Sequence, residues 1–160
     1  MSEPDILLTR IDNRLIHGQV ATQWIDAVGA NLILVANDGA ANNPTLQTLM
    51  NMAAPVGVAT RFFSVQKTID VIGKAGADQH IFMLVSTPED ALALVRAGVP
   101  IARVNVGNMH MTDGKRQVAA SVAVDDTDVA AFCELRDMGV ELEIRRVPTA
   151  EPEDVSKLFE

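Results

Sequence analysis

Hydrophobic residues follow two alternating patterns along this chain. Short, nearly continuous apolar runs, such as residues 80–86, are typical of strands that are covered on both faces of a parallel sheet. The stretches between these runs place apolar residues at helical spacing. The patterns predict strands at residues 5–10, 31–37, 58–64, 80–86, 102–107, 117–124 and 140–148, and helices at residues 18–28, 44–54, 65–76, 87–98, 125–139 and 151–159.

The regular alternation of strands and helices predicts an α/β protein. Helical crossovers join parallel strands, so the economical architecture is a mostly parallel central sheet of about seven strands with helices on both faces. The chain contains no internal repeat and no long linker. We therefore expect residues 1–160 to form a single domain with one hydrophobic core.

Ligands bind such sheets where loops leave the carboxyl ends of the strands. Three loops at these positions carry clustered polar residues, and we expect Asn37, Asp38, Asn108 and His110 at the rim of a site. For Asn37 and Asp38 the alternative is a simple turn, and for His110 it is an ordinary loop position. The three loops are IDNRLIHG (11–18), NDGAANNP (37–44) and GNMHMTDGK (107–115).

Composition and charge exclude several classes of function. The net charge is −8 and no basic run is present, which argues against nucleic acid binding. The single cysteine excludes an intrachain disulfide and a cysteine-based metal cluster. The spacing of His17, His80 and His110 does not suggest a zinc site, and no glycine-rich nucleotide motif occurs. We therefore expect no metal and no cofactor.

The amino-terminal residues MSEPDILLTR lack the basic and apolar regions of a signal peptide. No apolar stretch approaches the roughly 18–20 residues that span a bilayer. We therefore expect a cytoplasmic protein.

The loop at residues 11–18 places unusual chemistry in front of a predicted helix. His17 lies just before that helix, where free backbone N–H groups favour anions. Arg10 and Arg14 add donors that suit phosphate oxygens. A neutral imidazole can accept a phosphoryl group, and Asp12 can hold the other ring nitrogen or pair with Arg14. In the alternative interpretation Asp12 is a helix cap and the arginines are surface charges, and the residue types alone leave both open.

The run RIDNRLIHGQV, at residues 10–20, closely resembles the signature of the enzyme IIB component of mannose-type (mannose–fructose–sorbose) sugar phosphotransferase systems. The segment VNVGNMH, at residues 104–110, is similar to that family's Asn-Val-Gly-Gly-Met-His segment, with Asn108 at a position where glycine is common. The loop NDGAANNP, the chain length and the order of strands and helices extend the resemblance over essentially the whole chain.

The resemblance implies a phosphocarrier in which His17 is the catalytic residue. His17 would accept a phosphoryl group from a phosphohistidine of a IIA protein, on the ring nitrogen nearer the backbone. It would then pass the group to a sugar that enters through the membrane components IIC and IID. The implied activity is that of a protein-Nπ-phosphohistidine–sugar phosphotransferase, which needs no metal and no nucleotide.

The resemblance also implies roles for the neighbours of His17. Arg14, with the backbone of the loop from Asn13 to Gly18, would cradle the phosphoryl group. Asp12 would orient the loop. Arg10 is a weaker candidate for a supporting role, because it could point to the polar side of its strand.

Partners and substrate follow from the resemblance alone. It implies a IIA donor on a separate chain, a homodimer, and peripheral association of a cytoplasmic protein with the membrane permease. The sugar is left open, with a preference for an amino sugar such as N-acetylgalactosamine or galactosamine. The alternative function is a non-catalytic module of the same fold that senses an anionic metabolite at the first loop.

Overall fold

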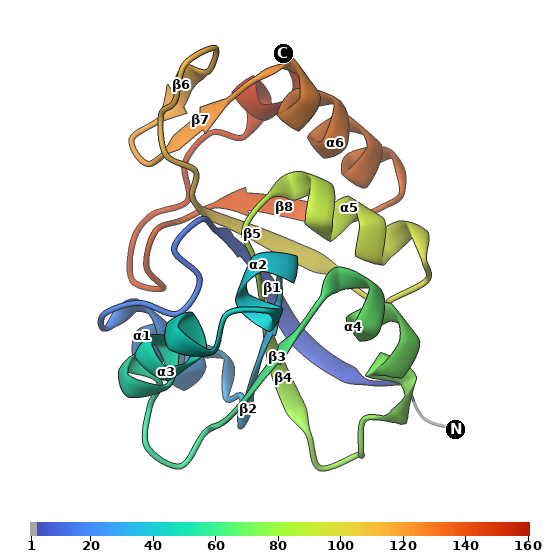
Figure 1. Cartoon of the computed structure of the whole chain (residues 1–160). Coiled ribbons are helices and arrows are strands. Elements are labelled where there is room, and N and C mark those ends of the chain that lie inside the picture. Colours follow the sequence, from blue (N-terminus) through green and yellow to red (C-terminus); the bar gives the residue numbers. More distant parts are fainter. Residues whose placement is uncertain (1–2) are drawn as a thin grey trace.

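The computed structural model describes residues 3–160 (Figure 1). Its centre is a six-stranded parallel sheet with the strand order β3-β2-β4-β1-β5-β8. The first strand of the chain, β1, therefore lies in the interior of the sheet between β4 and β5. The strands are β1 (Asp5–Asp12), β2 (Leu32–Ala36), β3 (Ala59–Phe63), β4 (His80–Val85), β5 (Arg103–Asn108) and β8 (Glu141–Ile144).

Helices cover both faces of the sheet and define two hydrophobic cores (Figure 1). Helices α1 and α3 pack on one face, and α4, α5 and α6 pack on the other. The helices are α1 (Val20–Val28), α2 (Asp38–Ala41), α3 (Pro44–Ala53), α4 (Val65–Val71), α5 (Pro88–Arg96) and α6 (Asp126–Asp137), with short 3₁₀ helices η1 (Ile72–Lys74) and η2 (Ser156–Phe159).

Strand β4 explains why the sequence shows continuous apolar runs. Its residues alternate between the cores: Phe82 and Leu84 contact the α1 side, and Met83 and Val85 contact the α5 side. Since side chains on a strand point to opposite faces in turn, a strand that is buried on both faces needs apolar residues at every position. Each of these large side chains contributes about 1.5–3 kcal/mol by its burial.

The predicted α/β architecture is confirmed, but the segment 117–124 is not a seventh strand of the sheet. It forms a separate antiparallel hairpin of β6 (Arg116–Ala119) and β7 (Val122–Val124). The backbone of Met109 bonds to Ser121 and to Ala123, which returns the hairpin to the carboxyl end of β5. This arrangement brings the hairpin turn to the same edge of the sheet as the first loop.

Two other predictions need correction. The expected helix at 151–159 is reduced to η2, because Glu153 first pairs with Ile144 at the edge of β8. The loop after β2 contains the short helix α2, which begins because Asn37 Oδ1 accepts a hydrogen bond from the Ala40 N–H at 2.8 Å. No helix within residues 3–160 is long and apolar enough to cross a membrane.

The connections of the central strands open a crevice at the carboxyl end of β1. The chain leaves β1 toward α1 on one face, whereas from the neighbouring strand β5 it leads through the hairpin to α6 on the other face. In open α/β sheets, adjacent strands whose connections diverge in this way leave room for a ligand between them. The fold thus points to the loop at residues 13–19 as the place for a site.

Candidate functional site

A cleft of about 450 Å³ lies at the carboxyl end of β1. Three loops enclose it: the loop from β1 to α1, the turn of the β6–β7 hairpin, and the segment after β8, which runs close to the first loop (Figure 1). The cleft is lined by Arg10, Asp12, Arg14, His17, Val20, Gly107, Asn108, Ala120, Ser121, Arg146 and Val147.

The loop after β1 is held by its own apolar residues and by two backbone bonds. Leu15 and Ile16 are buried in the core on the α1 side. The Asn13 N–H donates to the Asn108 carbonyl, and the Leu15 N–H donates to the Asp12 carbonyl, each at 3.0 Å. Leu15 has a φ of +60°, a conformation that costs a non-glycine residue roughly 1 kcal/mol or more. The anchored loop presents the next side chain, that of His17, to the cleft.

Asp12 fixes the orientation of the His17 ring. The Asp12 side chain is fully buried, and its Oδ2 lies 2.9 Å from His17 Nε2. A carboxylate accepts hydrogen bonds, so this contact favours the tautomer with the proton on Nε2. Within residues 3–160, Nδ1 bonds to no other protein group, and the ring is 26% exposed. The nitrogen nearer the backbone therefore keeps its lone pair free at the cleft.

The Asp12 carboxylate is itself held from two sides. Its Oδ1 accepts from the Arg14 N–H at 3.0 Å, and its Oδ2 accepts from Arg10 Nη2 at 3.2 Å. The Arg10 guanidinium is almost fully buried, and burial lowers its pKa, although Asp12 and Glu143 oppose that shift. A buried charge requires a paired charge and hydrogen bonds, and Asp12 supplies the counter-charge.

Arg10 belongs to a polar row that crosses three neighbouring strands. Arg10 on β1 is paired in register with Asn105 on β5, which is paired with Glu143 on β8. Arg10 Nη1 donates to Asn105 Oδ1 at 2.6 Å, and Asn105 Nδ2 donates to Glu143 Oε1 at 3.0 Å. The row therefore fixes the guanidinium that holds Asp12.

Two further residues make room for the Arg10 guanidinium. Its central carbon lies 5.3 Å from the centre of the Trp24 ring on α1, which is a cation–π contact. On the other side, a Cβ atom at Gly107 would lie 2.0 Å from that carbon. Only glycine fits at position 107, because any side chain there would occupy the space of the guanidinium.

The cleft offers donors for an anion beside His17. Arg14 and Arg146 both line it and are exposed. Helix α1 begins at the cleft with Val20, and its N-cap residue Gln19 forms no side-chain cap. The first N–H groups of α1 are therefore left for water or an anion. Together these groups are suited to a phosphoryl group on the imidazole.

The structure brings together most of the residues that the sequence singled out. Arg10, Asp12, Arg14, His17 and Asn108 line one cleft. Gly18, next to His17, has a φ of +50° that glycine adopts without strain.

Other predicted site residues lie outside this cleft. Asn13 and His110 line a neighbouring pocket, and Asn13 Oδ1 accepts from Asn108 Nδ2 at 2.7 Å. Asn37 caps α2 and donates to Ser86 Oγ, and Asp38 Oδ1 accepts from the Val65 N–H. Asn37 and Asp38 therefore do not line the cleft at His17, and their side chains bond as in the turn that was the alternative.

Sequence reasoning missed Arg146, Ser121, Asn105, Gly107 and Trp24. The predicted strand at residues 140–148 included Arg146, whereas β8 ends at Ile144 and so leaves Arg146 at the carboxyl edge of the sheet. Ser121 was hidden by the interpretation of 117–124 as a sheet strand. Asn105 and Trp24 act through tertiary contacts, which the local sequence pattern does not predict.

Among residues 3–160, Glu89, Asp125 and Asp128 form the one group of acidic side chains close enough to share a cation. The Lys115 ammonium already lies 2.9 Å from Asp128 Oδ2. Burial, followed by a hydrogen bond with Asp128, raises the pKa of Glu89 to about 7. A protein cation and a shared proton thus account for this cluster without a metal ion.

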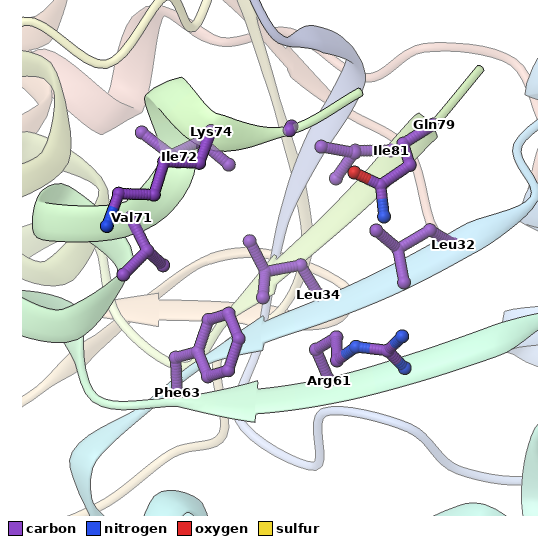
Figure 2. Close-up of a pocket in the computed structure, with 10 residues that line it drawn as sticks. Leu32, Leu34, Arg61, Phe63, Val71, Ile72, Lys74, Gln79 and Ile81 are labelled. Carbon is purple, nitrogen blue, oxygen red and sulfur yellow. The ribbon is translucent and has the colours of Figure 1, made fainter. Parts of the chain in front are cut away.

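A second pocket, of about 170 Å³, lies between η1 and the edge of the sheet (Figure 2). Its walls are mainly aliphatic, and no residue of the polar row around Asp12 reaches it. The residues that line it are Leu32, Leu34, Arg61, Phe63, Val71, Ile72, Lys74, Ala75, Gln79 and Ile81.

Comparison with known proteins matches residues 6–160 to the family model described as "PTS system sorbose subfamily IIB component". The chain is 51% identical over 156 residues to the N-acetylgalactosamine-specific phosphotransferase enzyme IIB component 2 of Escherichia coli K12, covering 98% of this chain and 99% of the relative. It is 41% identical over 143 residues to the sorbose-specific EIIB component of Klebsiella pneumoniae, covering 89% and 87%.

Solved structures agree with these matches. The crystal structure of the N-acetylgalactosamine-specific IIB component 1 from Escherichia coli superposes with a TM-score of 0.91 at 45% identity, covering 94% of this chain and 99% of that one. The IIB domain of the sorbose permease from Klebsiella pneumoniae superposes with a TM-score of 0.89 at 37% identity, covering 96% and 95%.

Proposed function

Because this chain belongs to the sorbose-type IIB components of sugar phosphotransferase systems and is a phosphocarrier of a mannose-family system, we propose that His17 is the residue that carries the phosphoryl group. The observation that carries the proposal is the contact between Asp12 Oδ2 and His17 Nε2, which leaves Nδ1 free at the cleft. As the family's name implies, the protein works with IIA and with the membrane components IIC and IID.

The first step is attack by the His17 Nδ1 lone pair on the phosphorus of phosphohistidine in the IIA protein. A new N–P bond forms at Nδ1 while the donor's N–P bond breaks, and the donor imidazole leaves with the bonding pair. The His17 ring, bonded to phosphorus at Nδ1 and to hydrogen at Nε2, becomes positively charged. The buried Asp12 carboxylate stabilises that charge across the 2.9 Å contact.

Charge on the transferring group is stabilised by the donors around it. Phosphoryl transfer spreads negative charge over the equatorial oxygens and demands mainly positioning and electrostatic stabilisation. The Arg14 guanidinium and the first N–H groups of α1 lie at the cleft for that purpose. In the second step a sugar hydroxyl attacks the same phosphorus and releases its proton to water. An O–P bond forms, and His17 recovers its lone pair as the N–P bond breaks.

The substrate we propose is an amino sugar, N-acetylgalactosamine. Support comes from two N-acetylgalactosamine-specific IIB components of Escherichia coli, which share 51% and 45% identity with this chain. The test is to combine the phosphorylated protein with membranes that contain a N-acetylgalactosamine-specific or a mannose-specific IIC/IID pair. Faster formation of phosphorylated N-acetylgalactosamine supports the assignment, and a preference for the mannose pair contradicts it.

We also propose that residues 1–160 act as one IIB domain, that the protein is a homodimer, and that it works in the cytoplasm at the membrane permease. Size-exclusion chromatography with light scattering tests the oligomeric state. A molecular mass of one chain at micromolar concentration would contradict the dimer. Fractionation of cells with and without the permease tests the association with the membrane.

Intact-mass spectrometry tests the role of His17. The protein is incubated with phosphoenolpyruvate, the general phosphotransferase proteins and a matching IIA. We expect the gain of one acid-labile phosphoryl group, its loss in His17→Ala, and its retention in the matched control His80→Ala. His80 begins β4 at the opposite end of the sheet and pairs there with Asp5. A His17→Ala protein that still gains the group would contradict the assignment.

A further inference from the structure

Building on the proposed role of His17, we propose that Arg146 is a second phosphoryl-binding residue and that Trp24 positions it. Arg146 follows β8 and lines the same cleft as Arg14 and His17. Its guanidinium forms no ion pair or hydrogen bond with any other group in the described part of the chain, residues 3–160. An exposed arginine without a protein partner, at the mouth of an anion site, is available to the ligand.

The backbone that carries Arg146 is held firmly, in contrast to its side chain. Trp24 Nε1 donates to the Arg146 carbonyl at 3.3 Å. The preceding carbonyl, that of Arg145, accepts from Arg10 Nη1 at 3.1 Å and from Asn105 Nδ2 at 3.2 Å. The Arg145 N–H donates to the Val106 carbonyl at 3.2 Å. These four bonds fix the segment after β8 against α1, β1 and β5.

The same groups therefore order both sides of the cleft. Arg10 holds Asp12, which orients His17, and Arg10 also holds the Arg145 carbonyl. Trp24 stacks on the Arg10 guanidinium and also holds the Arg146 carbonyl. A network that fixes the nucleophile together with the backbone of an unpaired arginine is preorganised for a ligand that contacts both residues.

Charge supplies the chemical reason for a second arginine. A phosphoryl group carries about two negative charges, and in transfer they spread over three oxygens. The chain has a net charge of −8, which repels such a group at long range. Arg14 provides one guanidinium at the cleft, and Arg146 provides another from a different loop. Guanidinium groups form planar, charge-assisted pairs with phosphate oxygens.

The test compares Arg146→Gln and Arg146→Lys with the matched control Arg61→Gln. Arg61 is an exposed arginine on the edge strand β3 and lines the other pocket (Figure 2). The measurement is the single-turnover rate of phosphoryl transfer from phospho-IIA over a range of phospho-IIA concentrations. We expect Arg146→Gln to lower the maximal rate about 10- to 100-fold, Arg146→Lys to restore part of it, and Arg61→Gln to match the wild type.

The positioning role of Trp24 is tested by Trp24→Phe, which keeps an aromatic ring and removes the indole N–H. We expect the maximal rate to fall about 2- to 10-fold, with little further loss when Trp24→Phe is added to Arg146→Gln. Additive losses in the double variant would overturn the positioning role. Circular dichroism confirms that each variant is folded.

The outcomes separate this proposal from the role of His17. If wild-type protein gains no phosphoryl group on His17, the proposed function fails before any variant is compared. If the wild type is phosphorylated and Arg146→Gln transfers at the same maximal rate, only the role of Arg146 is overturned. A variant that weakens the apparent affinity for phospho-IIA at an unchanged maximal rate also overturns it, since that result describes a docking contact.

Discussion

Two arginines on strands of the same sheet, Arg10 and Arg61, show how the cleft at His17 differs from the pocket of Figure 2. Arg10 is almost fully buried and bonds to Asn105, Asp12 and the Arg145 carbonyl. Arg61 is exposed and donates to the carbonyl of its neighbour Thr60. Burial of a charge is costly unless its partners are arranged around it, so only the first arginine imposes an order on its surroundings.

The difference between the two arginines shows which of the two cavities is suited to chemistry. The pocket at the sheet edge has aliphatic walls and lies where a short 3₁₀ helix covers the sheet incompletely. The cleft at His17 has a buried carboxylate, a free imidazole nitrogen and two exposed arginines. Polar groups that converge on one point, each held by a second contact, indicate a functional site better than a well-shaped apolar pocket does.

Among variants that keep His17, the largest effect is expected for Asp12→Asn. The amide can donate to His17 Nε2, which stabilises the tautomer with the proton on Nδ1 and so removes the nucleophilic lone pair. We expect phosphoryl transfer from phospho-IIA to slow by at least about 100-fold in single-turnover assays. The matched control is Asp38→Asn, whose side chain bonds only at the start of α4. Equal rates of phosphoryl transfer for the two variants would contradict the distinction between the cleft and its surroundings.

Gly107→Ala tests the packing around Arg10. The added Cβ would lie 2.0 Å from the central carbon of the guanidinium, so Arg10 must move away from Asp12. We expect the free energy of unfolding to fall by about 1–3 kcal/mol, with slower transfer. Urea denaturation measures the first effect. Gly73→Ala is the control, because a Cβ there meets no atom within 4 Å, and a loss as large at position 73 would refute the explanation.

The acidic cluster of Glu89, Asp125 and Asp128 provides a third region, in which we expect charge to affect stability but not phosphoryl transfer. The pKa of Glu89 is raised to about 7, mainly by burial, so the folded state holds a proton that the unfolded state releases above about pH 4.5. Stability should therefore fall as the pH rises toward 7. For Asp128, burial acts to raise the pKa, but hydrogen bonds with Glu89 and Lys115 outweigh burial, and the net pKa is lowered. Asp128 is therefore already ionised in the pH range over which Glu89 titrates.

Since Glu89 is only partly buried, solvent screening reduces the effect, and we expect a loss of only about 1 kcal/mol between pH 5.5 and pH 8. Urea denaturation of Glu89→Gln at both pH values should show a smaller change. The exposed Glu151→Gln should behave as the wild type. If Glu89→Gln kept the full pH dependence, another group would be responsible.

The smallest effect is expected for Arg61→Gln. An exposed side chain that bonds to a neighbouring carbonyl contributes within about 0.5 kcal/mol to stability. Urea denaturation should therefore give the wild-type midpoint. A large loss of stability would show that the pocket of Figure 2 depends on this arginine and would weaken the contrast with Arg10.

Sequence patterns predicted the elements whose periodicity is strong. The apolar runs of β2 and β4 and the capped helix α5 lie within one or two residues of their expected bounds. The segment 117–124 was interpreted wrongly, because an alternation of apolar residues does not reveal that a turn at Ala120 and Ser121 folds the strand back on itself. A hairpin outside the sheet and a strand within it have the same local pattern.

The site was predictable where its residues are close together in the sequence. Arg10, Asp12, Arg14 and His17 lie within eight positions, and their cluster marked the cleft. Sequence alone did not show that Arg10 is buried. The exposure of a strand residue depends on which face of the sheet it points to and on what covers that face. Arg146 lies far along the chain and reaches the cleft only because β8 joins the sheet beside β5.

The central claim is that Asp12 holds Nε2 of His17 so that Nδ1 carries the phosphoryl group. The most direct measurement is long-range ¹H–¹⁵N NMR of protein labelled with ¹⁵N in histidine, before and after phosphorylation by phospho-IIA. The structure predicts a proton on Nε2 of His17 in the free protein and phosphorus bonded to Nδ1 in the phosphorylated protein. Phosphorus bonded to Nε2, or a proton on Nδ1 in the free protein, would contradict the account.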